Sequence, residues 1–207
     1  PNPMVGCVVL DKDGKLISKG YHKKYGKNHA ERDALLKLNN NEAEGGTLYV
    51  NLEPCSHFGK TPPCVDLIIK HKLKRVVIGM KDVNPKVDGI TKLKNAGIEV
   101  DFVLEEEARF LNRMFIKTMT EKMPYVVLKT ASTMDGKIAS KTGSSKWITS
   151  ETARKEVYRM RKEFDCIMTS SNTVIADNPS MQHNFKCILD KDLRTPKDAK
   201  IYQQGEI

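Results

Sequence analysis

The sequence predicts an α/β protein built from two successive domains. Segments typical of β-strands alternate with segments of helical spacing, a pattern that favours a parallel or mixed sheet covered by helices on both faces. This alternation stops at Lys122–Pro124, a proline-containing junction, and then begins again. With 207 residues, the chain is long enough for one large domain or two small ones.

The first part of the chain contains most of the expected elements. Strands are expected at Val5–Leu10, Leu16–Gly20, Thr47–Val50, Arg75–Gly79 and Ile98–Leu104. The first two flank a turn sequence that is typical of a hairpin. Helices are expected at Ala30–Leu38, Thr61–Ile69, Thr91–Asn95 and Glu105–Met119, where apolar residues recur at helical spacing. Asn28 and Thr61 are the expected N-caps of the first two helices.

The second part of the chain restarts with a β-branched segment, Tyr125–Thr130, which we expect to be a strand. An amphipathic helix follows at Glu151–Lys162 with Ser150 as its cap, and then a strand at Cys166–Ser170. We place the domain boundary between residues 122 and 123, so that the domains are 1–122 and 123–207. The second domain is too short to be a complete α/β nucleotide-binding domain.

Composition narrows the class of protein. The formal charge is +9, but lysines are spread along the chain and aromatic residues are only 6%, which favours a solvated lysine-rich surface over a nucleic-acid footprint. A phosphorylated substrate remains possible. No apolar run is long enough to span a bilayer. Five cysteines are an odd and sparse set for a disulfide scaffold and indicate a cytoplasmic protein. Because the chain opens without methionine, we expect it to begin inside a longer protein.

The residues that indicate chemistry lie between His29 and Cys64. His29 and Glu31 form a His-x-Glu pair at an expected helix start, and Cys55 follows an expected strand. The side chains of His29, Cys55 and Cys64 would fill three positions of a tetrahedral zinc site and leave the fourth open, as in catalytic sites. The metal would acidify a bound water, and Glu31 would transfer the proton. We also expect the helix dipole to lower the pKa of Cys64.

Each of these residues also has a purely structural explanation. Glu31 could complete a capping box with Asn28, and buried cysteines are common in protein cores. In combination, however, His-x-Glu followed by Pro-Cys and a second Cys is the signature of zinc-dependent base deaminases. The sequence departs from that signature because eight residues, Ser56–Pro63, separate the two cysteines instead of two.

Several motifs make the resemblance to one family specific. The opening Pro1–Gly6, the motif His29–Glu31 and the long insertion between the cysteines resemble the bifunctional deaminase–reductases of riboflavin biosynthesis. Further along, Lys129–Lys137, Ser145–Ser150 and Asp177–Pro179 resemble motifs of the reductase part of that family. The resemblance therefore covers nearly the whole chain.

The resemblance implies a cytidine-deaminase-like three-layer α/β/α domain followed by a partial dihydrofolate-reductase-like α/β domain. It also implies two reactions. A zinc-dependent step would hydrolytically deaminate 2,5-diamino-6-(5-phosphoribosylamino)pyrimidin-4(3H)-one. A step dependent on NADPH would then reduce the ribosyl chain to a ribityl chain.

For the deaminase, the resemblance assigns roles to five residues outside the metal centre. Asn2 and His22 would contact the pyrimidine or its ribose, and Lys60 would help to hold the substrate. Asp82 and Asn84 would meet the ribose-phosphate end. Without the resemblance, an ordinary turn at Asn84 and a solvated charge at Lys60 would be the simpler interpretations.

For the reductase, six residues fall on positions that match the family and would bind cofactor or substrate: Lys129, Asp135, Trp147, Thr149, Arg161 and Asp177. The segment after Asp177 lacks the arginine that the family usually places there, and the family continues far beyond Ile207. No Gly-x-Gly-x-x-Gly motif is present, so the NADPH assignment rests on the resemblance alone.

Two other functions remain open. A nucleic-acid base deaminase of the same superfamily would need an open basic groove and a short cysteine spacing. A non-enzymatic zinc clip would need a fourth protein ligand, for which His57 is the candidate. The role of His57 is otherwise undecided. We expect a phosphoribosylated pyrimidine as the partner, no nucleic acid or membrane, and a homo-oligomer.

Overall fold

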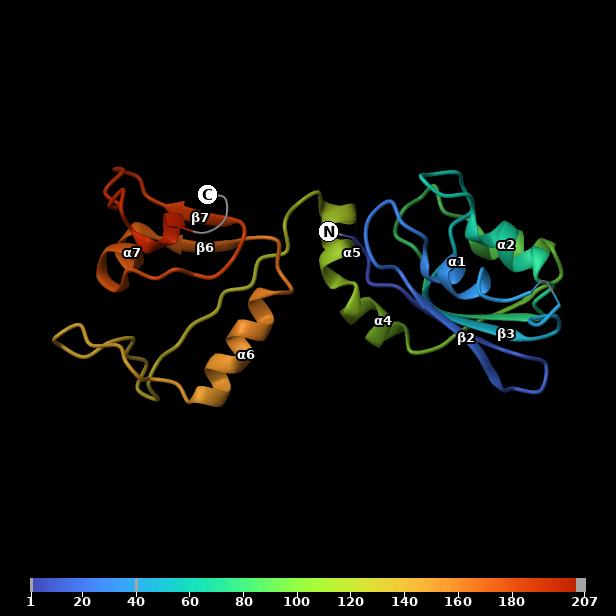
Figure 1. Ribbon diagram of the computed structural model, residues 1–207, viewed down its shortest axis with the longest axis horizontal. Coiled ribbons are helices and arrows are strands. Elements are labelled where there is room, and N and C mark those ends of the chain that lie inside the picture. Colours follow the sequence, from blue (N-terminus) through green and yellow to red (C-terminus); the bar gives the residue numbers. More distant parts are fainter. Residues whose placement is uncertain (1, 40, 204–207) are drawn as a thin grey trace. The chain divides into compact units, whose positions relative to one another are not determined.

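The computed structural model describes residues 2–39 and 41–203 and divides the chain into two compact units, residues 1–126 and residues 127–207 (Figure 1). Pro1 of the opening motif and Asn40, after the first expected helix, lie outside the described residues. The assignment of a deaminase domain to residues 1–122 and a reductase domain to residues 123–207 stays a prediction. Among the described helices, none has the length and apolar character needed to cross a bilayer.

A mixed five-stranded sheet forms the centre of the first unit. Its strands are β1 (Gly6–Leu10), β2 (Leu16–Tyr21), β3 (Thr47–Leu52), β4 (Arg75–Met80) and β5 (Glu99–Phe102), in the spatial order β2-β1-β3-β4-β5. β1 pairs antiparallel with β2 and β3, whereas β3, β4 and β5 are parallel. All five predicted strands and the predicted hairpin are confirmed. The parallel pairing brings the carboxyl ends of β3 and β4 to the same edge of the sheet.

Helices lie on both faces of this sheet. On one face, α1 (Ala30–Leu35), α2 (Cys64–Lys70) and α3 (Gly89–Asn95) bury apolar side chains against the strands in one continuous core. On the other face, α4 (Glu105–Leu111) lies against β4. Gly79 permits this approach, since a Cβ atom there would lie 2.8 Å from the Cβ of Ala108 on α4. The expected three-layer α/β/α arrangement is thereby confirmed.

Both predicted helix caps in this unit are wrong. The N-cap of α1 is His29 instead of Asn28, and the N-cap of α2 is Pro63 instead of Thr61. Neither N-cap side chain accepts a capping hydrogen bond. Thr61 and Pro62 each precede a proline, which disfavours helical backbone, so the helix begins only at Cys64.

The helix expected at Glu105–Met119 is two helices, α4 and α5 (Arg113–Glu121), separated by Asn112. Asn112 is 2% exposed. Its side chain hydrogen-bonds the backbone of Met4, which lies 108 positions earlier in the chain. Helical spacing carries no information about such a distant partner, so the break could not be predicted.

The second unit contains α6 (Glu151–Arg161), β6 (Ile167–Ser170), α7 (Ser171–Asp177), β7 (Lys186–Leu189) and a 3₁₀ turn at Lys200–Gln203. Ser150 caps α6 as predicted, because its Oγ accepts a hydrogen bond from the Ala153 N–H. β6 and β7 pair in parallel as a two-stranded sheet.

The strand predicted at Tyr125–Thr130 is wrong. The segment has no regular structure, and its side chains are exposed apart from the half-buried Tyr125. β-Branched composition favours a strand only where a neighbouring strand supplies pairing and burial. Among the described residues no strand pairs with this segment.

Candidate functional site

Three predicted metal ligands converge at the start of two helices. His29 immediately precedes α1, Cys64 is the first residue of α2, and Cys55 lies in the loop after β3. The Nδ1 atom of His29 is 3.4 Å from the Cys55 Sγ and 3.5 Å from the Cys64 Sγ. All three ligand atoms lie within 4.8 Å of one another. One imidazole nitrogen and two sulfurs form a donor set that fits zinc well.

The two thiols have opposite tendencies to ionise. Hydrogen bonding with Cys64 and with His29 lowers the pKa of Cys55 to about 4, despite partial burial. The same pairing with Cys55, together with burial, raises the pKa of Cys64. The predicted lowering of the Cys64 pKa by the helix dipole is therefore wrong, because the neighbouring sulfur dominates. The backbone N–H of Cys64 donates to the Cys55 Sγ at 3.3 Å, which further stabilises a thiolate at Cys55.

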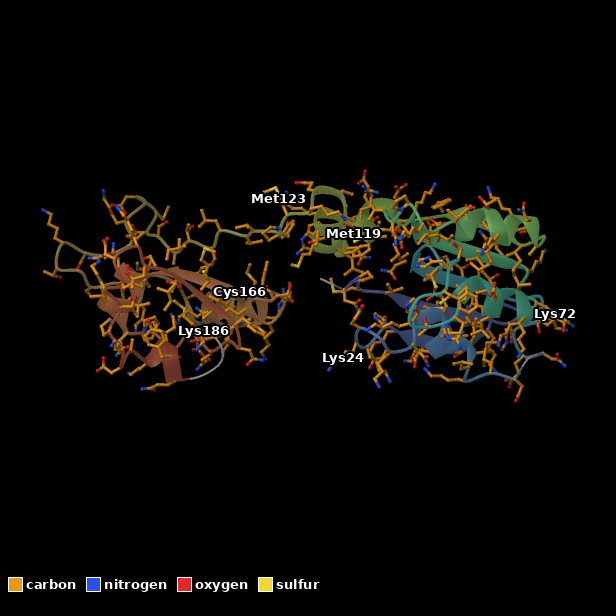
Figure 2. The ribbon with its side chains drawn as sticks, turned by 90° about the horizontal axis from the view of Figure 1, so that it is seen from above. Lys24, Lys72, Met119, Met123, Cys166 and Lys186 are labelled. Atoms are coloured by element: carbon orange, nitrogen blue, oxygen red, sulfur yellow. The ribbon has the colours of Figure 1, made fainter. Side chains whose placement is uncertain are left out.

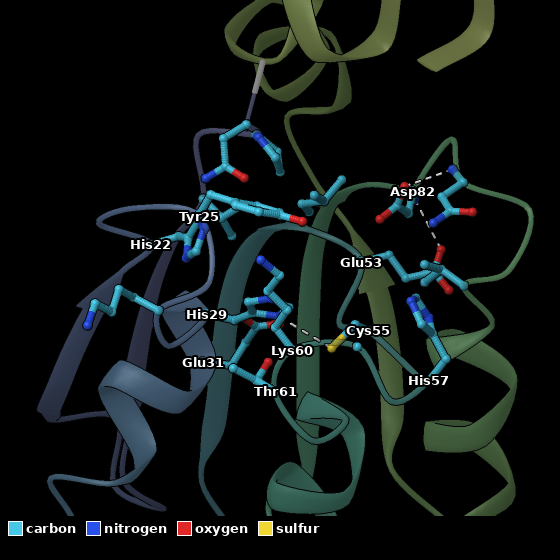
Figure 3. A pocket seen from close by; sticks show the side chains of 18 of the residues that line it. His22, Tyr25, His29, Glu31, Glu53, Cys55, His57, Lys60, Thr61 and Asp82 are labelled. Atoms are coloured by element: carbon cyan, nitrogen blue, oxygen red, sulfur yellow. Dashed lines mark hydrogen bonds between the residues drawn. The ribbon is translucent and has the colours of Figure 1, made fainter. Parts of the chain in front are cut away.

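Glu31 lies beside this ligand group, in the first turn of α1. Its side chain is 3% exposed, and burial raises its pKa to about 7. A carboxyl group whose pKa lies near neutrality can both accept and return a proton, which is the property required of a proton shuttle. In Figure 3 the Glu31 side chain lies next to His29 and Thr61 on the wall of a pocket.

A pocket of about 560 Å³ opens above the ligand group (Figure 3). Its lining includes His29, Glu31 and Cys55, so the buried acid and the metal ligands face the same cavity. The structure brings all the predicted substrate contacts of the deaminase to this one pocket: Asn2, His22, Lys60, Asp82 and Asn84. They come from four separate loops, and their roles stay predictions.

The long insertion between the cysteines forms part of the pocket wall. His57, Gly59, Lys60 and Thr61 all line the cavity. The Nζ of Lys60 lies 4.2 Å from the ring centroid of Tyr25, a pocket residue that sequence reasoning missed. The insertion thus presents a cation and hydrogen-bonding groups to a bound molecule.

His22 and His29, which both line the pocket, are in edge-to-face contact. Their ring centroids are 5.4 Å apart with an interplanar angle of 85°. The Nδ1 of His22 lies 2.9 Å from the carbonyl oxygen of Asn28, which fixes the ring orientation. The Nε2 atom of His22 is then the nitrogen available to a bound molecule.

Glu53 is a second residue that sequence reasoning missed. It is 3% exposed and lines the pocket. Its carboxylate accepts hydrogen bonds from three backbone N–H groups, those of Asp82 at 3.2 Å, Gly89 at 2.8 Å and Ile90 at 3.1 Å. Glu53 therefore ties the loop that carries Cys55 to the loop that carries Asp82 and Asn84. Its place directly before Pro-Cys after a buried strand was the available signal.

Two parts of the chain match known protein families. Residues 1–80 match the family described as the cytidine and deoxycytidylate deaminase zinc-binding region, and residues 124–207 match the RibD C-terminal domain. The riboflavin biosynthesis protein RibD of Aquifex aeolicus is 49% identical over 217 aligned residues, which cover 100% of this chain. The chain belongs to the RibD family.

Other RibD proteins agree with this assignment. RibD of Escherichia coli is 46% identical over 87% of this chain. The crystal structure of a diaminohydroxyphosphoribosylaminopyrimidine deaminase/5-amino-6-(5-phosphoribosylamino)uracil reductase from Thermotoga maritima matches with a TM-score of 0.92 and 43% identity, covering 100% of this chain and 62% of that one. The chain spans 60% of the Aquifex protein and 50% of the Escherichia coli protein.

The predicted reductase residues are not among those that line the pocket of the first unit. Trp147 is 73% exposed and stacks against Arg154, whose guanidinium carbon lies 4.2 Å from the ring centroid. The Thr149 carbonyl accepts a hydrogen bond from the same arginine. Arg161 donates to the Met181 carbonyl at 3.4 Å.

The remaining three predicted reductase residues are exposed. Asp135 accepts a hydrogen bond from the Thr133 hydroxyl within a tight turn. Lys129 lies in a segment without regular structure, and Asp177 is the last residue of α7. The contacts described for the six predicted reductase residues all lie within the second unit.

Proposed function

We propose that the full-length protein removes an amino group hydrolytically from a phosphoribosylated diaminopyrimidinone, the first of the two activities named for the Thermotoga relative. The observation that carries the proposal is the convergence of His29, Cys55 and Cys64 with the buried Glu31 on one pocket. Three protein ligands and an open cavity are the arrangement of a catalytic zinc site.

In this proposal, His29, Cys55 and Cys64 hold the zinc ion. When bound, zinc supplies a Lewis acid that makes water a nucleophile near neutral pH. Glu31 accepts the two protons of the attacking water in turn and delivers one to the ring nitrogen and one to the departing amine, which leaves as ammonia. Its raised pKa suits both halves of this transfer, because the group is neither a strong acid nor a strong base at neutral pH.

The pocket walls supply recognition. Asn2 can both donate and accept hydrogen bonds, which suits an amide-like pyrimidinone ring, and His22 offers its Nε2 atom. Lys60 supplies a positive charge for the phosphate group. Asp82 and Asn84 face the same cavity from a loop that Glu53 holds in place, and we assign them to the ribose.

For the second unit we propose the NADPH-dependent reduction, carried out only by the full-length protein. The described residues of this unit do not fit NADPH by themselves, since Trp147, Lys129, Asp135 and Asp177 are exposed and no described contact joins them. The predicted homo-oligomer and cytoplasmic location also stay predictions.

Two observations weigh against the alternative functions. Among the described residues, His57 does not belong to the group of ligand atoms, so a fourth protein ligand for a purely structural zinc is not provided. Lysines are dispersed over the first unit, as Lys24 and Lys72 illustrate (Figure 2). Lys72 is paired with Glu44 at 3.1 Å, as expected for a solvated surface and not for a nucleic-acid groove.

Ammonia release by the full-length protein, measured with and without a zinc chelator, tests the proposal. Glu31→Gln keeps the shape of the side chain but cannot exchange a proton. We expect it to retain one zinc per chain and to lose about 10²-fold or more in kcat. Chelator-insensitive release, or full activity in Glu31→Gln, would contradict the proposed chemistry.

A further inference from the structure

The segment that precedes β1 forms one wall of the pocket, although it belongs to no helix or strand. Asn2, Pro3 and Val5 all line the cavity. An irregular segment of this kind holds a side chain in one place only if its backbone is anchored elsewhere. The anchor here is the peptide backbone around Met4.

We propose that Asn112 is a positioning residue for the deaminase pocket, which it serves by fixing the Met4 backbone and thereby the place of Asn2. This inference rests on the proposed deaminase function. It makes the α4–α5 junction part of the deaminase machinery, although the junction lies beyond residues 1–80, the zinc-binding region defined by the family.

Asn112 contacts both polar groups of the Met4 backbone. The Met4 N–H donates to its Oδ1 at 2.8 Å, and its Nδ2 donates to the Met4 carbonyl at 3.3 Å. The amide side chain thus supplies the two hydrogen bonds that a neighbouring strand would give to Met4. Because Asn112 is 2% exposed, these bonds are shielded from competing water.

Asn51, near the end of β3, also binds the Met4 carbonyl. Its Nδ2 donates to the Met4 carbonyl at 2.8 Å, and its Oδ1 accepts from the Gly6 N–H at 2.8 Å. The backbone pairing of β1 with β3 ends at Cys7 and Val50. Asn51 therefore continues the hydrogen bonding beyond the last backbone pair, and its side chain shares the Met4 carbonyl with Asn112.

The chain between this anchor and Asn2 is stiff. Pro3 has a fixed φ angle, and a residue that precedes proline is restricted to extended conformations. With few free torsions between the two, the position of the Met4 peptide largely determines where Asn2 lies. The amide of Asn112 accordingly acts on the substrate through Asn2, without being a pocket residue itself.

The break between α4 and α5 has the same explanation. Asn112 has φ −99° and ψ 15°, so it leaves the helical backbone just where its side chain meets Met4. The interruption accompanies a buried side chain that bridges α4 and α5 to the backbone of the pocket wall.

A double-mutant cycle on the full-length, zinc-loaded protein tests this proposal. We expect Asn112→Ala to raise the KM for the phosphoribosylated diaminopyrimidinone by about tenfold, with zinc content unchanged. Asn2→Ala should raise KM to a similar degree. If Asn112 acts through Asn2, the double variant should be no worse than Asn2→Ala alone. KM is the proper readout because a partly unfolded sample lowers the apparent kcat but leaves KM unchanged.

Two further variants keep the test decisive. Asn112→Asp retains the acceptor for the Met4 N–H and replaces Asn112→Ala if that variant does not fold. Ile98→Val, a truncation in the core next to β5, should lower the Tm without changing KM. An unchanged KM in the Asn112 variants, or multiplied effects in the double variant, would overturn this inference alone. Absence of ammonia release from the zinc-loaded wild type would overturn the proposed function as well.

Discussion

The two units of this chain differ in how much of their apolar surface they bury. In the first, one continuous core joins α1, α2 and α3 to the sheet, with Leu48, Ile68 and Ile78 fully enclosed. In the second, the described core consists of Val174, Ala199 and Ile201. Large apolar side chains are exposed in both units, but in the second, where Leu128 is 86% and Trp147 is 73% exposed, the described core is much smaller.

The difference in packing parallels the difference in the functional sites. In the first unit, residues from separate loops meet in one pocket because the sheet edge and two helix starts hold those loops rigidly. In the second, the predicted reductase residues lie on α6, at the end of α7 and in segments without regular structure, and the described sheet of this unit has two strands. A site that depends on residues distant in sequence can form only where a core fixes their backbones.

The largest expected difference between the two units is the effect of removing one cysteine thiol on zinc content and ammonia release. We expect Cys55→Ala to lose the zinc and to lower kcat/KM for ammonia release by about 10³-fold or more, since the Lewis acid contributes several kcal/mol. Cys187→Ala, in β7 of the second unit, is the matched control and should leave both unchanged. Metal analysis and the ammonia assay measure these effects. Zinc retained by Cys55→Ala would show that the ligand set is wrong.

Core truncations should show the unequal packing directly. Leu48→Ala should lower the free energy of unfolding of the first unit by about 2–5 kcal/mol, because a cavity remains in a continuous core. Ile201→Ala should cost the second unit less, since its small core can collapse around the change. Denaturant titrations of the 207-residue chain, followed by amide exchange in each unit, compare the two. An equal loss of unfolding free energy in the two units would contradict the proposed difference in packing.

Substitution of a lysine in each unit tests whether only the first unit binds the substrate of the deamination. Lys60→Met should raise the KM by about tenfold, because a charge-assisted hydrogen bond to phosphate is lost. Lys129→Met, a matched change in the second unit, should leave this KM unaltered. A similar response to both substitutions would place the phosphate elsewhere than in the pocket of the first unit.

The smallest expected effect concerns pH and the second unit. Hydrogen bonds from Thr195 and Arg194 lower the pKa of Asp190 to about 2. Because the folded pKa lies below the unfolded value of about 3.9, this carboxylate stabilises the fold above pH 4, and the stabilisation is lost as the pH falls toward 2. We expect Asp190→Asn to flatten the pH dependence of amide protection in β7 over that window, with no change in β3. An unchanged profile would exclude Asp190 as its source.

The metal centre could be predicted from sequence because its signal is local. His29 and Glu31 are two positions apart, and Cys55 and Cys64 flank a single insertion. The strands of the first unit were equally predictable, because their apolar patterns match the burial that the sheet provides. Where the local sequence pattern agrees with the burial in the folded protein, the element can be predicted from sequence alone.

The errors arose where a distant partner decides the structure. Asn112 interrupts a helical pattern because of Met4, and the Glu53 carboxylate binds backbone N–H groups that lie 29, 36 and 37 positions later. The segment Tyr125–Thr130 has strand composition but no pairing partner among the described residues. Hydrophobic periodicity indicates which positions tend to be buried, but it does not identify the distant residues that contact them.

The most direct test of the contrast between the units is a parallel assay of the zinc-loaded 207-residue chain for ammonia release and for NADPH oxidation. The structure predicts ammonia release from the phosphoribosylated diaminopyrimidinone without NADPH oxidation, because only the first unit assembles its site among the described residues. NADPH oxidation by this chain, or no ammonia from folded protein with one bound zinc, would contradict the proposal that only the first unit forms a working site.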